Sequence, residues 1–116
     1  MIRKILLGVL VALLACSVAY AEAKPVLMVL STKTCPACRE MKKVLTQLNK
    51  KYPGIETQNI YLETKEGAMY GEMYEVEYVP TLVFKDASGE DFDMRVGYMS
   101  VEKIAKIFKN AGVKIN

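Results

Sequence analysis

The apolar positions of this 116-residue chain follow two different spacings, and each spacing predicts one kind of element. Residues 26–30 form an uninterrupted run of apolar, largely β-forming side chains, which is typical of a strand buried on both faces. Residues 36–51 instead repeat apolar side chains every three or four positions, which predicts an amphipathic helix. Pro36 suits the first helical position, and Tyr-Pro-Gly at 52–54 ends the pattern. The buried stripe of this helix is expected to contain Cys38, Met41, Val44, Leu45, Leu48 and Tyr52.

A second strand and a second helix follow. Residues 55–62 carry more polar side chains than the first strand, as an edge strand does. Residues 64–74 form a weaker helical pattern that two glycines interrupt. In this helix we expect Ala68, Met69 and Met73 to face the sheet as core residues, flanked by two tyrosines.

The last third of the chain predicts a hairpin and a closing helix. An apolar strand begins at Pro80, a position where a strand tolerates proline. After a loop at 85–90, residues 91–97 alternate and are expected to place Phe92, Met94 and Val96 on one face. Ser100 then caps a helix that ends at Gly112. The predicted order βαβαββα indicates an α/β fold.

The first 21 residues have the layout of a secretory signal peptide. Arg3 and Lys4 give a basic start, residues 5–15 are continuously apolar, and Ala-Tyr-Ala at 19–21 is a small-x-small cleavage site. We therefore expect an exported protein of the periplasm or cell envelope, with a single domain at 22–116.

Two alternatives to cleavage after residue 21 stay open. Leu-Leu-Ala-Cys at 13–16 resembles a bacterial lipobox, which would leave a lipid anchor on Cys16. In the second alternative, residues 5–21 stay on the protein as an uncleaved membrane anchor, although 17 residues are fewer than the about 20 that a membrane-spanning helix needs.

Charge and composition exclude several function classes. The net charge of +3 falls to +1 once Arg3 and Lys4 are removed, which leaves no basic footprint for nucleic acid. The chain has no histidine, so a CxxCH haem site, a Cys-His protease pair and a histidine-containing zinc site are excluded. We expect no metal ligand set, no cofactor beyond a redox-active disulfide, and a monomer.

The candidate chemistry lies in Cys35-Pro36-Ala37-Cys38, where the first strand meets the first helix. With Pro36 at the first helical position, Cys35 falls at the N-cap and Cys38 one turn inside. Free N–H groups and the positive end of the helix dipole stabilise a thiolate at the N-cap, so we expect the pKa of Cys35 to lie below the free value of about 8.5. Arg39 is near enough to Cys35 for its positive charge to stabilise the thiolate further. Cys38 is expected to be less exposed and to resolve, which together make a disulfide-exchange pair.

The cysteine motif, the downstream Val79-Pro80-Thr81 strand and a glycine before the closing helix together resemble the thioredoxin family. The resemblance implies a thioredoxin-like fold, with a four-stranded mixed sheet and helices on both faces. It implies that Cys35 attacks, that Cys38 resolves, and that Pro80 is cis and adjoins the dithiol. The Val79 backbone would then pair with an extended substrate strand.

Several positions depart from the family pattern. Val29 occupies the place of the buried acid that thioredoxins carry six residues before the first cysteine, and Lys33-Thr34 replaces the aromatic residue ahead of the motif. Tyr78 stands where a small residue is common, so it should narrow the substrate groove. Ala37 replaces the histidine of strongly oxidising exported relatives. The paired glycines that glutaredoxins use for glutathione are not matched at 97–100.

These features predict an envelope thiol–disulfide oxidoreductase, a reductase or electron carrier rather than a strong oxidase. Its partners would be protein thiols and disulfides and a membrane electron donor. Two other functions stay open: metal handling through Cys35 and Cys38, and a non-catalytic binding module that docks a partner beside Pro80.

Overall fold

The computed structural model describes residues 23–116, so the predicted leader at 1–21 and the alternative lipidation of Cys16 lie outside the described residues. No helix within 23–116 has both the length and the apolar character that crossing a membrane requires. The elements follow the predicted βαβαββα order. Their bounds are β1 Val26–Ser31, α2 Pro36–Lys51, β2 Glu56–Tyr61, α3 Lys65–Met73, β3 Thr81–Lys85, β4 Asp91–Val96 and α4 Val101–Asn110.

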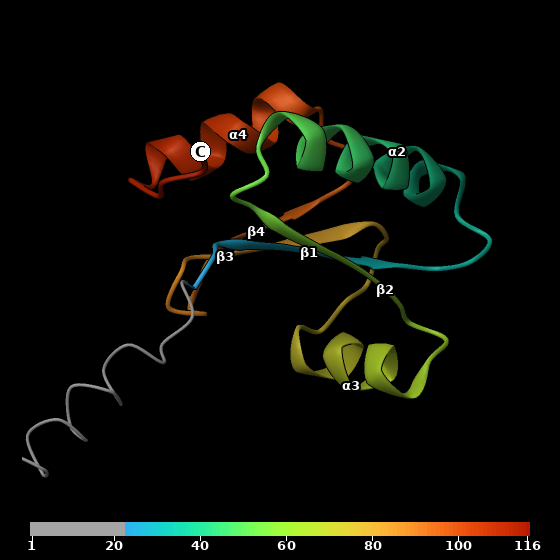
Figure 1. The fold of residues 1–116 in the computed structure, drawn as a ribbon. Coiled ribbons are helices and arrows are strands. Elements are labelled where there is room, and N and C mark those ends of the chain that lie inside the picture. The colour runs from blue at the N-terminus through green and yellow to red at the C-terminus, as the bar shows by residue number, and fades with distance from the viewer. Residues whose placement is uncertain (1–22) are drawn as a thin grey trace, which may run out of the picture.

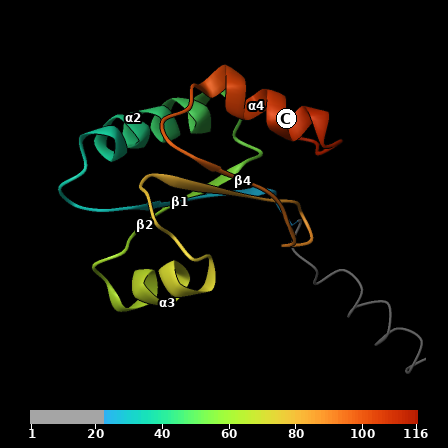
Figure 2. The ribbon, with the colours of Figure 1, turned by 180° about the vertical axis from the view of Figure 1, so that it is seen from behind.

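The four strands form one mixed sheet in the order β2-β1-β3-β4. Strand β1 runs parallel to β2 and antiparallel to β3, and β4 extends the sheet as an antiparallel edge. Helices α2 and α4 cover one face and α3 covers the other (Figure 1), and the view from behind shows the same two layers (Figure 2). The α/β fold class is therefore confirmed, with β1 central and β2 at an edge as predicted.

Strand β1 is apolar from Val26 to Leu30 because each of its faces meets a separate core. Leu27 and Val29 belong to the larger core under α2 and α4, whereas Met28 and Leu30 belong to the smaller core on the α3 side. All four side chains are fully buried. Successive strand residues point to opposite faces, so a strand covered on both sides needs no polar alternation.

Helix α3 contradicts the prediction for its buried face. Met69 and Met73 are 53% and 61% exposed, and Ala68 is also exposed. The helix instead turns Tyr70 and Tyr74 to the smaller core, and Gly67 is its buried residue. The reason is the close approach of Gly67 to the backbone at Tyr61, which sets the rotation of the helix against the sheet.

Strand β4 contradicts the second prediction, because Phe92 does not share a face with Met94 and Val96. Lys85 pairs with Asp91 while Phe84 pairs with Asp93, so a β-bulge leaves Phe92 as the extra residue. Phe92 packs against the rings of Phe84 and Phe108 in the larger core. Beyond the bulge the alternation is reversed, so Met94 and Val96 lie on the α3 side and are 49% and 59% exposed.

Three polar side chains join the end of α3 to the β3–β4 hairpin. Lys85 Nζ lies 2.6 Å from Asp91 Oδ1, and the Tyr74 hydroxyl donates to Asp91 Oδ2 at 2.8 Å. Burial raises the pKa of Tyr74. Burial alone would lower the pKa of Lys85, but its hydrogen bonds to Asp91 and Tyr74 outweigh that effect and leave the pKa raised. The cluster thus favours a charged lysine and a neutral phenol.

We predict that Gly67→Ala lowers the free energy of unfolding by about 1–3 kcal/mol, since the added methyl group would collide with the Tyr61 carbonyl. Gly71→Ala in the same helix is the matched control. Its methyl group would meet only the end of the flexible Leu62 side chain, at 3.1 Å, so the change should be neutral or stabilising. Urea unfolding of both variants measures the difference, and equal effects would contradict the close-approach account.

Candidate active site

Cys35 lies at the N-cap of α2, as predicted. Its backbone is extended (φ −89°, ψ 114°), Pro36 follows in the first turn, and the Cys38 N–H donates a hydrogen bond to Cys35 Sγ at 3.1 Å. The sulfur thus takes the place of the oxygen of a usual capping side chain. The same N–H would stabilise a thiolate at this position in the reduced protein.

Cys35 and Cys38 form a disulfide, so the structure is that of the oxidised protein. Cys38 is 3% exposed and belongs to the buried stripe of α2, whereas Cys35 is only half-buried. The predicted difference in exposure is confirmed. An attacking group from solvent reaches Cys35 first, because the Cys38 side chain is buried.

The segment before β3 lies beside the disulfide although it is 44 residues further along the chain. The Val79–Pro80 bond is cis, and the Val79 carbonyl oxygen lies 3.9 Å from Cys35 Sγ. A disulfide sulfur carries no proton, so this approach is a van der Waals contact in the oxidised protein. Pro80 is buried and Val79 half-buried. Within residues 23–116 the Val79 N–H makes no hydrogen bond, which leaves it free for a bound peptide.

The remaining predicted site residues are exposed, on the two segments that carry Cys35 and Val79. Tyr78 is 69% exposed on the Val79 side. Thr34, Pro36, Ala37 and Arg39 are exposed on the α2 side.

Two residues that support the Val79 segment were not assigned to the site from the sequence. The Thr81 hydroxyl donates to the Tyr78 carbonyl at 2.6 Å, and the Gly97 N–H donates to the Pro80 carbonyl at 2.8 Å. Gly97 has φ +102°, a conformation that favours glycine. The signal that could have found it is the glycine directly before the closing helix.

No buried carboxylate lies among the residues that the structure describes. Val29 is fully buried, and Ser31 and Thr81 are the only buried polar side chains within 23–116. Cys38 therefore has no acidic neighbour in the core that could take its proton. Residues 23–116 also contain no group of three or more His, Cys, Asp or Glu side chains arranged to hold a metal ion.

This arrangement allows a partner thiolate to attack the Cys35 sulfur in the oxidised protein, and the Cys35 thiolate to attack a partner disulfide in the reduced protein. A half-buried sulfur receives an N–H bond at a helix N-terminus, a second sulfur lies one turn along, and an unoccupied backbone donor lies beside them. These are parts that disulfide exchange uses: an accessible nucleophile, a resolving thiol and a surface on which the partner chain can bind.

Comparisons with known proteins agree with this geometry. The family model described as a thioredoxin-like domain matches residues 14–112. A thioredoxin-like protein from Clostridium perfringens, solved in solution, is 32% identical with a TM-score of 0.71, over 82% of this chain and 76% of that one. Thioredoxin O2 from Arabidopsis thaliana, in its oxidised state, is 23% identical with a TM-score of 0.63, over 76% of this chain and 75% of that one.

A more distant match is thioredoxin-2, a component of the malaria parasite protein secretion machinery. It is 17% identical with a TM-score of 0.69, over 78% of this chain and 86% of that one. At this identity the match shows the fold alone.

We predict that iodoacetamide modifies Cys35 well before Cys38 when the fully reduced protein is treated at pH 6. The half-buried Cys35 sulfur has the N–H donor and the open surface, whereas Cys38 is buried. Peptide mass spectrometry of a brief labelling reaction locates the label. Labelling of Cys38 first would contradict the N-cap account.

Proposed function

This chain belongs to the thioredoxin-like family, and from that premise we propose that it is a thiol–disulfide oxidoreductase that exchanges electrons with protein thiols and disulfides. The observation that carries the proposal is the disulfide between Cys35 at the N-cap of α2 and Cys38 one turn inside. Cys35 is the proposed attacking group and Cys38 the proposed resolving group.

In the reductive direction the reaction takes two exchanges. The Cys35 thiolate attacks one sulfur of a substrate disulfide, forming a mixed disulfide and releasing the other substrate sulfur as a thiolate. Cys38 loses its proton to that thiolate or to water and attacks Cys35 Sγ. The Cys35–Cys38 disulfide forms and the second substrate sulfur leaves. Two electrons pass to the substrate, and two protons accompany them.

The Val79 segment supplies the proposed substrate-binding surface. Its free N–H and its carbonyl group, 3.9 Å from Cys35 Sγ, can pair with an extended peptide and hold a substrate cysteine in line with the sulfur. Tyr78 projects beside this segment and would pack on the bound chain. Pro80, Thr81 and Gly97 keep the segment in place.

The direction of electron flow is proposed from the motif. A lower pKa of the attacking thiol makes a disulfide more oxidising, and histidine inside a CxxC motif lowers it further. Ala37 is exposed and apolar and offers no such stabilisation. We therefore favour a reductase or electron carrier over a strong oxidase, supplied with electrons by a membrane partner.

The proposed site of action is the cell envelope, from the leader pattern at 1–21. The intact mass of the protein recovered from expressing cells is expected to match a chain that begins at Glu22. A mass that retains residues 1–21, or one that shows lipid on Cys16, would replace this proposal with one of the two anchored forms.

We predict that Cys35→Ser abolishes the dithiothreitol-driven reduction of insulin. Cys38→Ser should instead accumulate a mixed disulfide through Cys35, because the resolving sulfur is missing while the attacking one remains. Non-reducing electrophoresis and peptide mapping identify the trapped bond. Insulin reduction by the Cys35→Ser variant at the rate of the unmodified protein would contradict the proposed function.

A redox titration against glutathione buffers tests the direction. We expect a potential more negative than about −180 mV, in the range between protein disulfide isomerase and thioredoxin. A value close to about −120 mV, typical of a strong periplasmic oxidase, would show that electrons flow the other way.

A further inference from the structure

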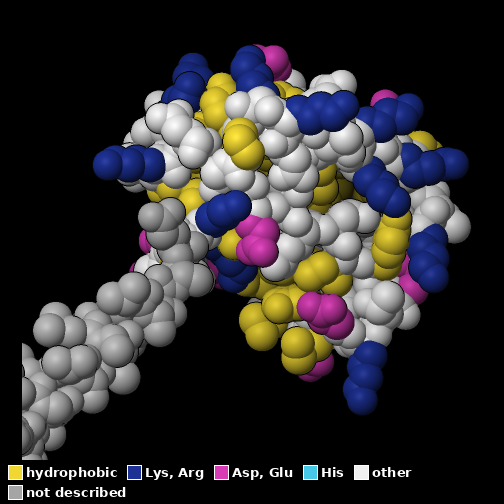
Figure 3. Space-filling view, viewed as in Figure 1, with side chains coloured by type: hydrophobic (Ala, Val, Ile, Leu, Met, Phe, Trp, Pro, Cys, Tyr) yellow, Lys and Arg dark blue, Asp and Glu magenta, His cyan; other side chains and the backbone are white. Residues whose placement is uncertain are grey.

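The charges of the described residues are segregated between the two faces of the sheet. The solvent-exposed positions of α2 and α4 carry eight basic side chains and two acidic ones, Glu40 and Glu102. The basic set is Arg39, Lys42, Lys43, Lys50, Lys51, Lys103, Lys106 and Lys109. The opposite layer is acidic, since residues 62–77 contain five glutamates and one lysine. Figure 3 shows basic side chains over the α2/α4 layer and acidic and apolar ones around α3.

The basic layer reaches the proposed attacking sulfur. A hollow of about 420 Å3 lies beside the first turns of α2, lined by Pro36, Ala37, Arg39, Glu40 and Lys43. It begins one residue after Cys35, so a protein bound at that sulfur would lie over it. Amphipathic helices often have lysines on their outer face, but here the basic face is continuous with the reactive end of α2.

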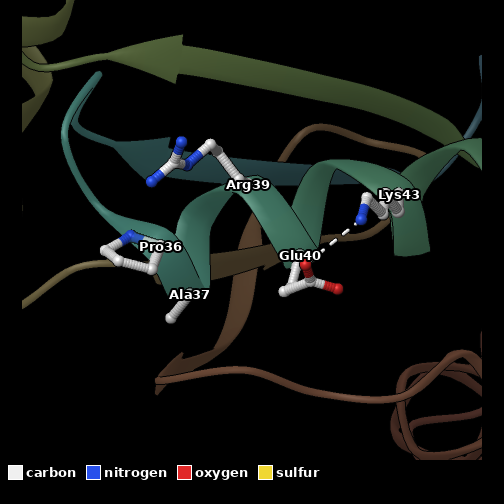
Figure 4. Close-up of a pocket in the computed structure, with 5 residues that line it drawn as sticks. All are labelled: Pro36, Ala37, Arg39, Glu40 and Lys43. Carbon is white, nitrogen blue, oxygen red and sulfur yellow. Dashed lines mark hydrogen bonds and ion pairs between the residues drawn. The ribbon is translucent and has the colours of Figure 1, made fainter.

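Arg39 is the charged residue of this hollow that has no ion-pair partner among the described residues. Lys43 forms an ion pair with Glu40 at 3.2 Å, whereas Arg39 makes no ion pair within residues 23–116. Figure 4 shows the Arg39 side chain extending toward the N-terminal end of α2 and the Lys43–Glu40 pair lying further along the helix. The positive end of the α2 dipole adds to the same field. The guanidinium group of Arg39 can therefore form an ion pair with an acidic side chain of a bound partner.

We propose that Arg39, with Lys43, selects protein substrates whose disulfide is flanked by acidic residues. This inference rests on the proposed function and names the substrate class for the same site. The carboxylates of the bound segment occupy the hollow over Pro36 and Ala37, while the substrate cysteine lies at Cys35. Arg39 acts here as a specificity residue for the bound substrate.

The test compares three synthetic peptides that contain the same disulfide loop flanked by aspartates, by lysines or by serines. The reduced full chain is expected to reduce the aspartate peptide roughly tenfold faster, in kcat/KM, than the lysine peptide at low ionic strength. In 0.5 M salt the ratio should fall to within about twofold of unity, because exposed charges are then screened within a few ångströms. A ratio near unity at low salt would overturn the proposal.

Matched variants on the same helix separate a local subsite from a general field. The double variant Arg39→Gln, Lys43→Gln is expected to bring the aspartate-to-lysine ratio of kcat/KM within about twofold of unity. The double variant Lys50→Gln, Lys51→Gln removes the same charge at the far end of α2 and should keep most of the preference for the aspartate peptide. The ratio is the readout because a change in Cys35 reactivity alters all three rates equally. Equal loss in both variants would overturn the proposal in favour of steering by net charge.

Two further measurements keep the outcomes distinct. Failure to reduce even the serine peptide would count against the proposed function and not only against this inference. Cosedimentation with vesicles containing phosphatidylglycerol tests the other anionic partner. Vesicle binding that both variants weaken equally, with no preference among the peptides, would assign the basic face to a membrane surface and overturn the proposal.

Discussion

The chemistry of this protein depends on one constraint, which is that a sulfur must occupy the N-cap of α2. The first turn of a helix has N–H groups without internal partners, and the capping position is where a side-chain acceptor can use them. Cys35 accepts the Cys38 N–H at 3.1 Å, so the residue that stabilises the attacking sulfur also carries the resolving one. Because α2 packs through Met41, Leu45 and Leu48 on the sheet, the core of the domain holds this sulfur in place.

The fold was predictable where periodicity and burial agree. The bounds of α2 follow from Pro36 and the apolar stripe, and the central position of β1 follows from its unbroken apolar run. The errors arose where a contact distant in sequence decides which face is buried. A bulge opposite Phe84 and Lys85 reverses the alternation of β4, and the approach of Gly67 to Tyr61 sets the rotation of α3. Neither contact leaves a signal in local spacing.

The site was predictable in its chemistry but not in its surroundings. The cysteine pair and its helix start are local, so residues 35–38 were sufficient to find them. The position of Val79 beside Cys35 came from the family resemblance, because 44 residues separate the two. The hydrogen bonds by which Thr81 and Gly97 support the Val79 segment, and the segregated charges of the two layers, became visible only in the three-dimensional arrangement. The small net charge of the chain gives no sign of this segregation, because the charges of a basic face and an acidic face largely cancel in the total.

The most direct test of the central claim is a pH titration of the thiolate absorbance near 240 nm in the reduced protein, with the Cys35→Ser variant subtracted. A sulfur stabilised at the helix start should ionise with a pKa at least about one unit below the free-cysteine value of about 8.5. A pKa for Cys35 at or above about 8.5 would contradict the account, because the N-cap would then confer no acidity on the sulfur.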